Sequence, residues 1–152
     1  MWRYSFIFFC IAIIGCQSTA RYRSASNASR DSNRLEQFIS EWIGTPYQYG
    51  GLSKNGVDCS GFVLILMQEV YGIRLPRTSY DQYKRGYKIT RNRLRKGDLV
   101  FFNIFPKRGV DHVGFCLGGD KFIHVGTNTG VIISKLSEDY YSKCYYGACR
   151  YF

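Results

Sequence analysis

The stretch Val57-Asp58-Cys59-Ser60-Gly61-Phe62-Val63 decides the fold of this chain. Asp58 is predicted to be the N-cap of a helix, because its carboxylate can accept a hydrogen bond from an otherwise unpaired backbone N–H in the first turn. Apolar residues recur at helical spacing as far as Val70, and Gly72 is a typical C-terminal stop. Cys59 then lies at the positive end of the helix macrodipole, where a thiol ionises more easily. It is therefore a candidate nucleophile, with a small core residue as the alternative.

The elements around this helix predict an α+β domain, because helices come first along the chain and strands follow. With 152 residues, the chain is long enough for one compact domain and too short for two. An amphipathic helix over residues 32–42 precedes the cysteine helix, and a shorter helical stretch over 75–85 follows it. Short strands of an antiparallel sheet are predicted at residues 87–89, 99–102, 112–117, 121–125, 131–135 and 145–151.

The excess of basic residues indicates which classes of molecule the protein could bind. The formal net charge is +10, from 21 Lys and Arg against 11 Asp and Glu, which favours nucleic acid, a membrane surface or an acidic polymer. No run of Lys or Arg exceeds two residues and no nucleic-acid motif is present. Nucleic acid is therefore not an expected partner.

The N-terminus has the pattern of an export signal. Residues 1–15 hold one charged side chain, Arg3, and an apolar run too short to span a bilayer, which needs about 20 residues. Ile13-Ile14-Gly15-Cys16 resembles a bacterial lipobox, in which the cysteine is lipidated and becomes the mature N-terminus. An ordinary signal peptide or an uncleaved anchor is the alternative. Gln17 follows in place of an aspartate, which by this resemblance favours the outer membrane.

The rest of the chain divides into a tether and a domain. Residues 16–33 are rich in Ser, Arg, Asn and Ala and have almost nothing to bury, so they predict a flexible tether. The domain is expected over residues 34–152. An oxidising compartment would permit a disulfide between Cys144 and Cys149, but the four residues between them need not bring the thiols together.

The chain has only two histidines, His112 and His124, and both lie in predicted strands. A three-residue loop at 118–120 would place His124 opposite Gly114. Since side chains alternate along a strand, both histidines would then point to one face as diagonal neighbours, whereas a loop of even length would separate them. Asp111 would point to the other face and is a poor orienting partner.

Cys59, His112 and His124 could supply the nucleophile, the base and the orienting group of a thiol mechanism. His124 is expected to accept a hydrogen bond from Nδ1–H of His112, so that Nε2 of His112 faces the Cys59 sulfur. Structural histidines are one alternative. A zinc site built from the same three residues is another, although their spacing lacks a close ligand pair.

Together these motifs resemble the NlpC-type cell-wall peptidases, a papain-like family of bacterial cysteine peptidases. The motifs run in family order from about residue 35 to the C-terminus. Within the family, the small single-domain lipoproteins of the Spr/MepS kind, which are murein endopeptidases, are the most similar. The matching segments are residues 44–51, 58–62, 75–79, 97–102, 112–114, 122–124 and 130–134.

The resemblance implies a papain-like α+β fold, with N-terminal helices packed on an antiparallel sheet and one helix carrying the nucleophile. It implies peptidoglycan stem peptides as substrate, Cys59, His112 and His124 as catalytic residues, and neither a cofactor nor a metal. The Tyr47 hydroxyl can bind substrate or the developing oxyanion, with the Cys59 backbone N–H as a second donor. Cys116 departs from the family pattern and is expected to pack in the core. The residues matched to substrate contacts are Tyr47, Asp58, Ser60, Arg77 and Ser79.

The expected activity is hydrolysis of peptide cross-links in peptidoglycan, and the Spr/MepS-like resemblance favours the D,D bond between the diamino acid and D-Ala. Cleavage between γ-D-Glu and the diamino acid is the alternative enzyme, and acyl transfer is a further use of the same thiol chemistry. A catalytically silent wall-binding lipoprotein is the alternative of another class, and an ordinary helix start is the alternative for Arg77 and Ser79. The protein is expected to be a monomeric outer-membrane lipoprotein, facing the periplasm and anchored through Cys16.

Overall fold

The computed structural model describes residues 18–106 and 108–152. The predicted signal segment over residues 1–15 and the predicted lipidation site Cys16 lie outside the described residues. Within the described ranges, no helix is both long and apolar enough to cross a membrane.

Helix α2 (Cys59–Tyr71) begins at the predicted N-cap and ends at the predicted glycine. The Asp58 carboxylate accepts a hydrogen bond from the backbone N–H of Gly61 at 2.7 Å. Gly72 is in the left-handed conformation, with φ 70°, and its N–H bonds back to carbonyls of the last turn. The apolar residues of the helix that have no exposed surface are Phe62, Val63, Leu66 and Met67.

In the described residues, six strands form an antiparallel sheet in the order β3-β8-β4-β5-β6-β7, and β1 and β2 form a separate small hairpin. Each predicted strand of the large sheet is present, with ends that differ from the prediction by at most one residue. The strands are β1 (Leu52–Ser53), β2 (Gly56–Val57), β3 (Tyr87–Ile89), β4 (Leu99–Phe102), β5 (His112–Gly118), β6 (Lys121–Gly126), β7 (Gly130–Lys135) and β8 (Tyr145–Arg150).

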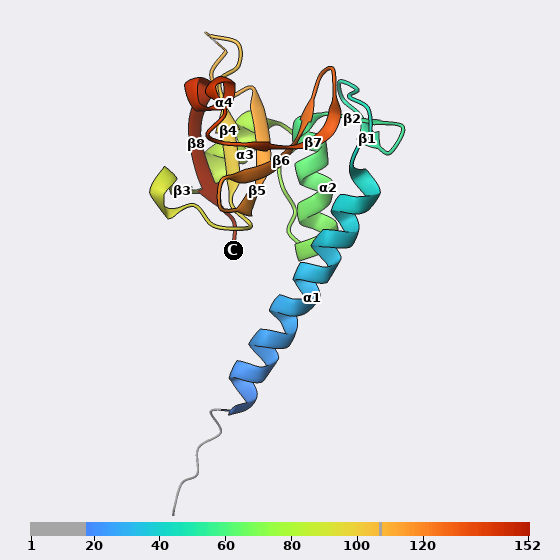
Figure 1. The fold of residues 1–152 in the computed structure, drawn as a ribbon, viewed down its shortest axis with the longest axis vertical. Coiled ribbons are helices and arrows are strands. Elements are labelled where there is room, and N and C mark those ends of the chain that lie inside the picture. Colours follow the sequence, from blue (N-terminus) through green and yellow to red (C-terminus); the bar gives the residue numbers. More distant parts are fainter. Residues whose placement is uncertain (1–17, 107) are drawn as a thin grey trace, which may run out of the picture.

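Helices cover both faces of the sheet. The remaining elements are α1 (Ser18–Trp42), α3 (Ser79–Arg85), α4 (Asp139–Cys144) and a 3₁₀ turn, η1 (Arg91–Arg93). Helix α2 packs on β5 and β6, and α1 packs on α2, so these two helices lie on one side of the sheet (Figure 1). On the other face, Tyr141 of α4 packs against Phe102 and Phe122. Each face of the sheet therefore has its own buried apolar cluster.

The β5–β6 hairpin keeps the predicted register at the histidines. Gly114 pairs with His124, so the two histidines point to one face of the sheet. The turn is shorter than predicted, because Gly118 pairs with Lys121 and leaves two residues between the strands. A β-bulge between Cys116 and Gly118 takes up the extra residue and restores the register.

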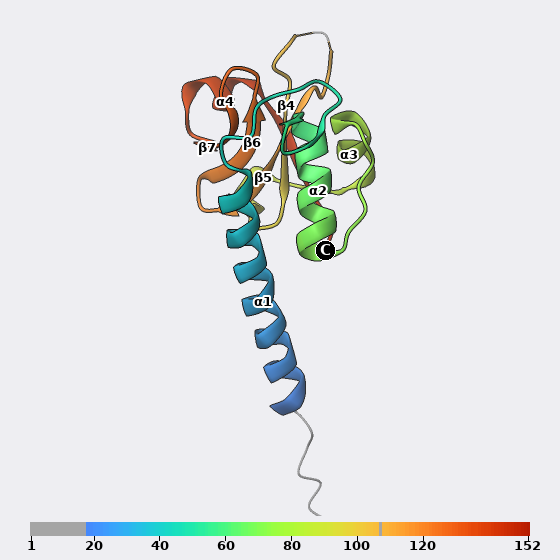
Figure 2. The ribbon, with the colours of Figure 1, turned by 90° about the vertical axis from the view of Figure 1, so that its right-hand side faces the viewer.

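Helix α1 includes most of the segment over residues 16–33 for which a flexible tether is predicted. The helix begins at Ser18, so most of that segment is helical. Its C-terminal part carries the buried residues Leu35, Phe38 and Trp42, and their packing stabilises the C-terminal turns of the helix. Ala and Arg, which have high helix propensity, recur through the preceding segment and allow the helix to continue towards its N-terminus. Figures 1 and 2 both show this part of α1 projecting away from the rest of the domain.

Four short elements were not predicted from the sequence, namely β1, β2, η1 and α4, and helix α3 begins within its predicted range. Helix α3 starts at Ser79, where the Thr78 hydroxyl accepts a hydrogen bond from the N–H of Asp81 at 3.2 Å. The two-residue strands β1 and β2 are too short to show an alternating pattern. The six residues of α4 are likewise too few for a helical periodicity.

The four cysteines of the described residues are free. Cys116 is fully buried, as expected of a core residue. The Cys144 thiol points to the carbonyl of Tyr141, and the Cys149 thiol points to the carbonyl of Gln82, each at 3.8 Å. These two cysteines therefore do not pair in this structure.

We predict that Gly114→Ala destabilises the domain. A Cβ at this position would lie 2.5 Å from a ring carbon of Phe122 and 3.2 Å from Cβ of His124, so the histidine strand would have to shift. Overpacking of this kind costs about 1–3 kcal/mol. Thermal unfolding should show a lower Tm, and an unchanged Tm would mean that the space beside Gly114 is not needed.

Candidate active site

Cys59 is the first residue of α2 and is partly exposed at its N-terminal end. Burial raises the pKa of its thiol to about 11, although a hydrogen bond from the backbone of Val113 lowers it. The Asp58 carboxylate also raises the pKa, since like charges repel. The thiol of the resting protein is therefore harder to ionise than its place at the helix N-terminus led us to expect, because burial outweighs the hydrogen bonds from the backbone. Cys59 needs a base to become a nucleophile.

His112 and His124 line the same cavity as Cys59, which has a volume of about 300 Å³. Nε2 of His112 lies 3.1 Å from Nδ1 of His124. The prediction that Nδ1 of His112 makes this contact is wrong, because strand register fixes the face of the sheet but not the broad ring torsion χ2. Nδ1 is thus the ring nitrogen of His112 that remains for the thiol.

Two hydroxyl groups meet the other nitrogen of His124. Nε2 lies 3.1 Å from Oγ of Ser134 and 3.1 Å from the hydroxyl of Tyr141. Phe122 stacks on the same imidazole, with ring centroids 4.8 Å apart. Polar groups therefore hold the ring of His124 at both nitrogens, and the phenyl ring of Phe122 packs against its face.

The two histidines are neutral near pH 7. Burial lowers the pKa of His112 to about 4. Burial, and then the charge of His112, lower the pKa of His124 to about 3. A neutral His112 can accept the proton of the Cys59 thiol, and the resulting charge pair would attract strongly in a site of low polarity.

Asp58 joins three segments at the start of α2. Oδ1 accepts from the N–H of Gly61, and Oδ2 accepts from the N–H of Gly50 at 2.9 Å. Arg77 donates to both carboxylate oxygens, at 2.9 and 2.5 Å. Ser60 donates to Asp58 and accepts from Arg77. Burial raises the pKa of Asp58, but the hydrogen bonds from Arg77 and the backbone outweigh it, so the pKa is lowered overall and the carboxylate stays charged.

The five residues predicted to contact substrate line a second cavity, which shares Cys59 with the first: Tyr47, Asp58, Ser60, Arg77 and Ser79. Burial raises the pKa of Tyr47, so its hydroxyl stays protonated and can donate a hydrogen bond. Asp58, Ser60 and Arg77 are engaged with one another, so the predicted N-cap role of Asp58 is part of a larger network. Their contact with substrate stays a prediction.

Asp111 also borders the site, but it does not orient a histidine. Its two carboxylate oxygens accept hydrogen bonds from the backbone N–H groups of Ile104 and Phe105, at 2.8 and 2.7 Å. It thereby fixes the loop between β4 and β5, which also lines the cavity beside His112.

Sequence reasoning missed Ser134 and Tyr141. Ser134 lies in a segment that matches the family motif, and its register, opposite Phe122, makes it a diagonal neighbour of His124. Pairing β6 with β7 could therefore have found it. Tyr141 carried no such signal, because α4 was not predicted and the chain has 13 tyrosines.

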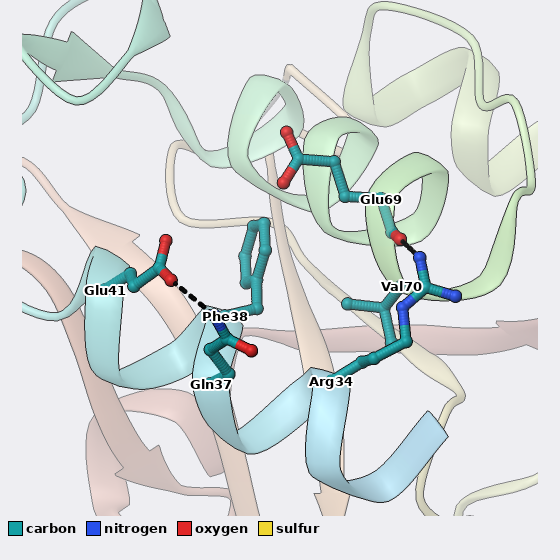
Figure 3. Close-up of a pocket in the computed structure, with 6 residues that line it drawn as sticks. All are labelled: Arg34, Gln37, Phe38, Glu41, Glu69 and Val70. Carbon is teal, nitrogen blue, oxygen red and sulfur yellow. Dashed lines mark hydrogen bonds between the residues drawn. The ribbon is translucent and has the colours of Figure 1, made fainter. Parts of the chain in front are cut away.

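A pocket outside this region lies between α1 and α2 (Figure 3). Arg34 donates to the backbone carbonyl of Glu69, and Gln37 donates to Glu41 at 3.0 Å within α1. None of the predicted site residues lines this pocket. It marks the contact between the two helices rather than the candidate active site.

The described part of the chain holds no group of three His, Cys, Asp or Glu side chains arranged to bind a metal ion. The zinc alternative for Cys59, His112 and His124 therefore finds no support in their geometry. The arrangement instead places a thiol and two hydrogen-bonded imidazoles around one cavity.

Curated proteins from several bacteria are similar in sequence to this chain. A Haemophilus influenzae protein named "Probable endopeptidase NlpC homolog" is 42% identical over 120 residues, which cover 79% of this chain and 63% of the relative. The Escherichia coli K12 protein named "Murein DD-endopeptidase MepS/Murein LD-carboxypeptidase" is 40% identical over 124 residues, covering 82% and 64%. The Bacillus subtilis "Gamma-DL-glutamyl hydrolase" is 35% identical over 133 residues, covering 87% and 32%. The match thus spans less than two thirds of the length of each of these relatives.

A solved structure of an NlpC/P60 family protein from Bacillus cereus superposes with a TM-score of 0.71 and 35% identity, covering 78% of this chain and 39% of that one. The helices and antiparallel sheet therefore form the papain-like α+β fold, as predicted. Residues 44–150 match the NlpC/P60 family. The chain belongs to the NlpC/P60 family, which confirms the family that the sequence motifs indicate.

The buried neutral histidines predict that stability falls in acid. Well above pH 6.5 both histidines are neutral in the folded and unfolded states, so they do not change stability. As the pH falls from 6.5 towards 4, the unfolded chain binds protons that folded His112 and His124 resist, which costs up to about 1.4 kcal/mol per pH unit for each histidine. The free energy of unfolding, measured with urea at several pH values, should decline less steeply in His124→Gln. Parallel declines for the two proteins would contradict this.

Proposed function

We propose that this protein is a thiol endopeptidase that hydrolyses peptide cross-links of peptidoglycan. The observation that carries the proposal is the placement of Cys59, His112 and His124 around one cavity, with His112 hydrogen-bonded to His124. A thiol, a neutral base and an orienting group are what nucleophilic attack on an amide requires. Family membership and relatives named as endopeptidases support the same reading.

The geometry suggests how each group acts. Nδ1 of His112 takes the proton of the Cys59 thiol, and the thiolate attacks the carbonyl carbon of the scissile bond. The resulting oxyanion would receive hydrogen bonds from the Cys59 backbone N–H and from the Tyr47 hydroxyl. His112 then returns the proton to the leaving amine as the C–N bond breaks, and water hydrolyses the thioester by the reverse sequence.

The stem peptide is proposed to lie in the cavity that Tyr47, Asp58, Arg77 and Ser79 line beside Cys59. The hydroxyl, carboxylate and guanidinium groups there suit a peptide with both amine and carboxylate substituents. Because Arg77 already binds Asp58 through both oxygens, the two charges largely offset each other before substrate arrives. We therefore assign this pair a positioning role as well as a contact role.

The D,D bond between the diamino acid and D-Ala is the favoured site of cleavage, on the strength of the relative named as a murein DD-endopeptidase. Cleavage between γ-D-Glu and the diamino acid is the second candidate, favoured by the relative named as a γ-DL-glutamyl hydrolase. A catalytically silent wall-binding protein is a weaker candidate, because binding alone does not need a hydrogen-bonded pair of histidines beside a cysteine.

The cellular site is proposed from the sequence. The lipobox-like segment ending at Cys16 supports a lipid-anchored protein, and Gln17 after it favours the periplasmic face of the outer membrane. We propose that the protein acts there as a monomer. The net charge of +10 is compatible with contact with an anionic wall or membrane surface.

We predict that Cys59→Ala lowers the rate of peptidoglycan hydrolysis by at least about 10³-fold, because it removes the nucleophile. Cys116→Ala is the matched control: this cysteine is buried in the sheet and should leave the rate nearly unchanged. The measurement is digestion of purified sacculi with identification of the products by mass spectrometry, which also names the bond cleaved. Hydrolysis at a similar rate in Cys59→Ala would refute the thiol mechanism, and loss of activity with EDTA but not with iodoacetamide would indicate a metal enzyme.

We predict that Cys16→Ala moves the full chain out of the membrane fraction or leaves it unprocessed. A single acyl chain holds a protein on a membrane only marginally, so stable attachment depends on the several chains of a mature lipoprotein. Fractionation and metabolic labelling with palmitate measure the effect. Unchanged fractionation without palmitate incorporation in the unsubstituted protein would exclude lipidation.

A further inference from the structure

The state of His124 decides which nitrogen of His112 is free for the thiol. His112 can accept the thiol proton at Nδ1 only if its own proton is on Nε2. That Nε2–H then points at Nδ1 of His124, 3.1 Å away, so Nδ1 of His124 must be an acceptor. The base therefore works only when His124 carries its single proton on Nε2.

Nothing in an isolated neutral imidazole enforces this choice. A neutral histidine carries its proton on either nitrogen, and the hydrogen bonds around it select the tautomer. His124 is 1% exposed, so water does not make the selection. The groups that meet Nε2 of His124 must do so, and these are the hydroxyls of Ser134 and Tyr141, each at 3.1 Å.

We propose that Ser134 and Tyr141 are positioning residues that hold His124 in its Nε2–H tautomer and thereby keep Nδ1 of His112 free to accept the thiol proton. The two hydroxyls act as acceptors for the Nε2–H of His124. The proposal rests on the thiol mechanism proposed above and adds two residues to it.

The two hydroxyls reach the same nitrogen of His124 from different elements. Each hydroxyl oxygen has lone pairs that can accept the Nε2–H of His124. Burial raises the pKa of Tyr141, so the phenol stays protonated at neutral pH. Both groups at Nε2 of His124 are therefore uncharged, so they place no charge beside the histidines.

The apolar surroundings fix the direction of the Tyr141 hydroxyl. Its ring lies edge-on to Phe102 and Phe122, with centroids 5.4 and 5.0 Å away, and edge-on to His124 at 5.1 Å. Ser134 is 7% exposed and is placed by the pairing of β6 with β7. Both hydroxyls therefore come from rigid elements, β7 and α4, rather than from a loop.

The first test is the proton position in the unsubstituted protein. The chain has only two histidines, so ¹H–¹⁵N spectra of the imidazole rings can be assigned with His124→Gln. We expect His124 to be neutral at pH 7 with its proton on Nε2. A proton on Nδ1 of His124 would overturn the proposal, and this measurement needs no variant at Ser134 or Tyr141.

The second test removes the hydroxyls and measures the reactivity of Cys59 without peptidoglycan. The variants are Ser134→Ala, Tyr141→Phe and the double variant, in the full chain, with alkylation of Cys59 by iodoacetamide at pH 7 followed by peptide mapping. Either single variant keeps one acceptor and should slow alkylation by less than about threefold. The double variant should slow it by about tenfold or more, because a wrong tautomer disables the base.

Matched controls separate this role from a structural one. Ser142→Ala and Tyr146→Phe remove the same groups from exposed positions of α4 and β8, and should leave alkylation unchanged. Ser134→Thr combined with Tyr141→Phe has a hydroxyl at position 134 that the double variant lacks. Its alkylation rate and Nε2–H signal should therefore match those of Tyr141→Phe alone. An alkylation rate in the folded double variant equal to that of the unsubstituted protein would overturn the proposal. Because neither readout uses peptidoglycan, failure of the proposed hydrolysis would be seen separately.

Discussion

The site depends on the hydrogen bonds that the Asp58 carboxylate accepts. It caps α2, binds the loop before that helix through the N–H of Gly50, and binds the segment before α3 through Arg77. The same carboxylate lies next to Cys59 and raises the pKa of the thiol, so it positions the nucleophile while opposing its ionisation. Pairing with Arg77 reduces that opposition, because the opposite charge weakens the field that the thiol experiences.

Much of this arrangement could be predicted from the sequence because it follows from local chemistry. The cap and the helix around Cys59 follow from side-chain type and helical spacing, and the strands follow from short apolar runs bounded by turn residues. The shared face of His112 and His124 was predicted correctly, but through a loop of the wrong length. The bulge after Cys116 offsets the shorter turn, so the register at the histidines is the same as a three-residue turn would give.

The parts that could not be predicted depend on contacts between distant segments. Strand register does not determine which nitrogen of His112 meets His124, because the ring torsion is set by the surrounding packing. The burial that raises the pKa of the Cys59 thiol is a property of the assembled domain. Tyr141 reaches His124 from a helix of six residues, too short to leave a periodic signal. The helical state of residues 18–33 depends on packing further along α1, which a polar segment considered alone does not reveal.

The length of α1 has a consequence for how the domain would explore its surroundings. A helix rises 1.5 Å per residue, so the 25 residues of α1 span about 38 Å, and its N-terminal part stands clear of the domain in both views (Figures 1 and 2). If Cys16 carries the proposed lipid, a random coil of that length would let the domain sweep a broad volume around the attachment point and touch the anchoring surface itself. A helical rod would instead set a stand-off distance and concentrate the domain in a thin shell, so that its effective concentration would be highest for substrate lying at that height.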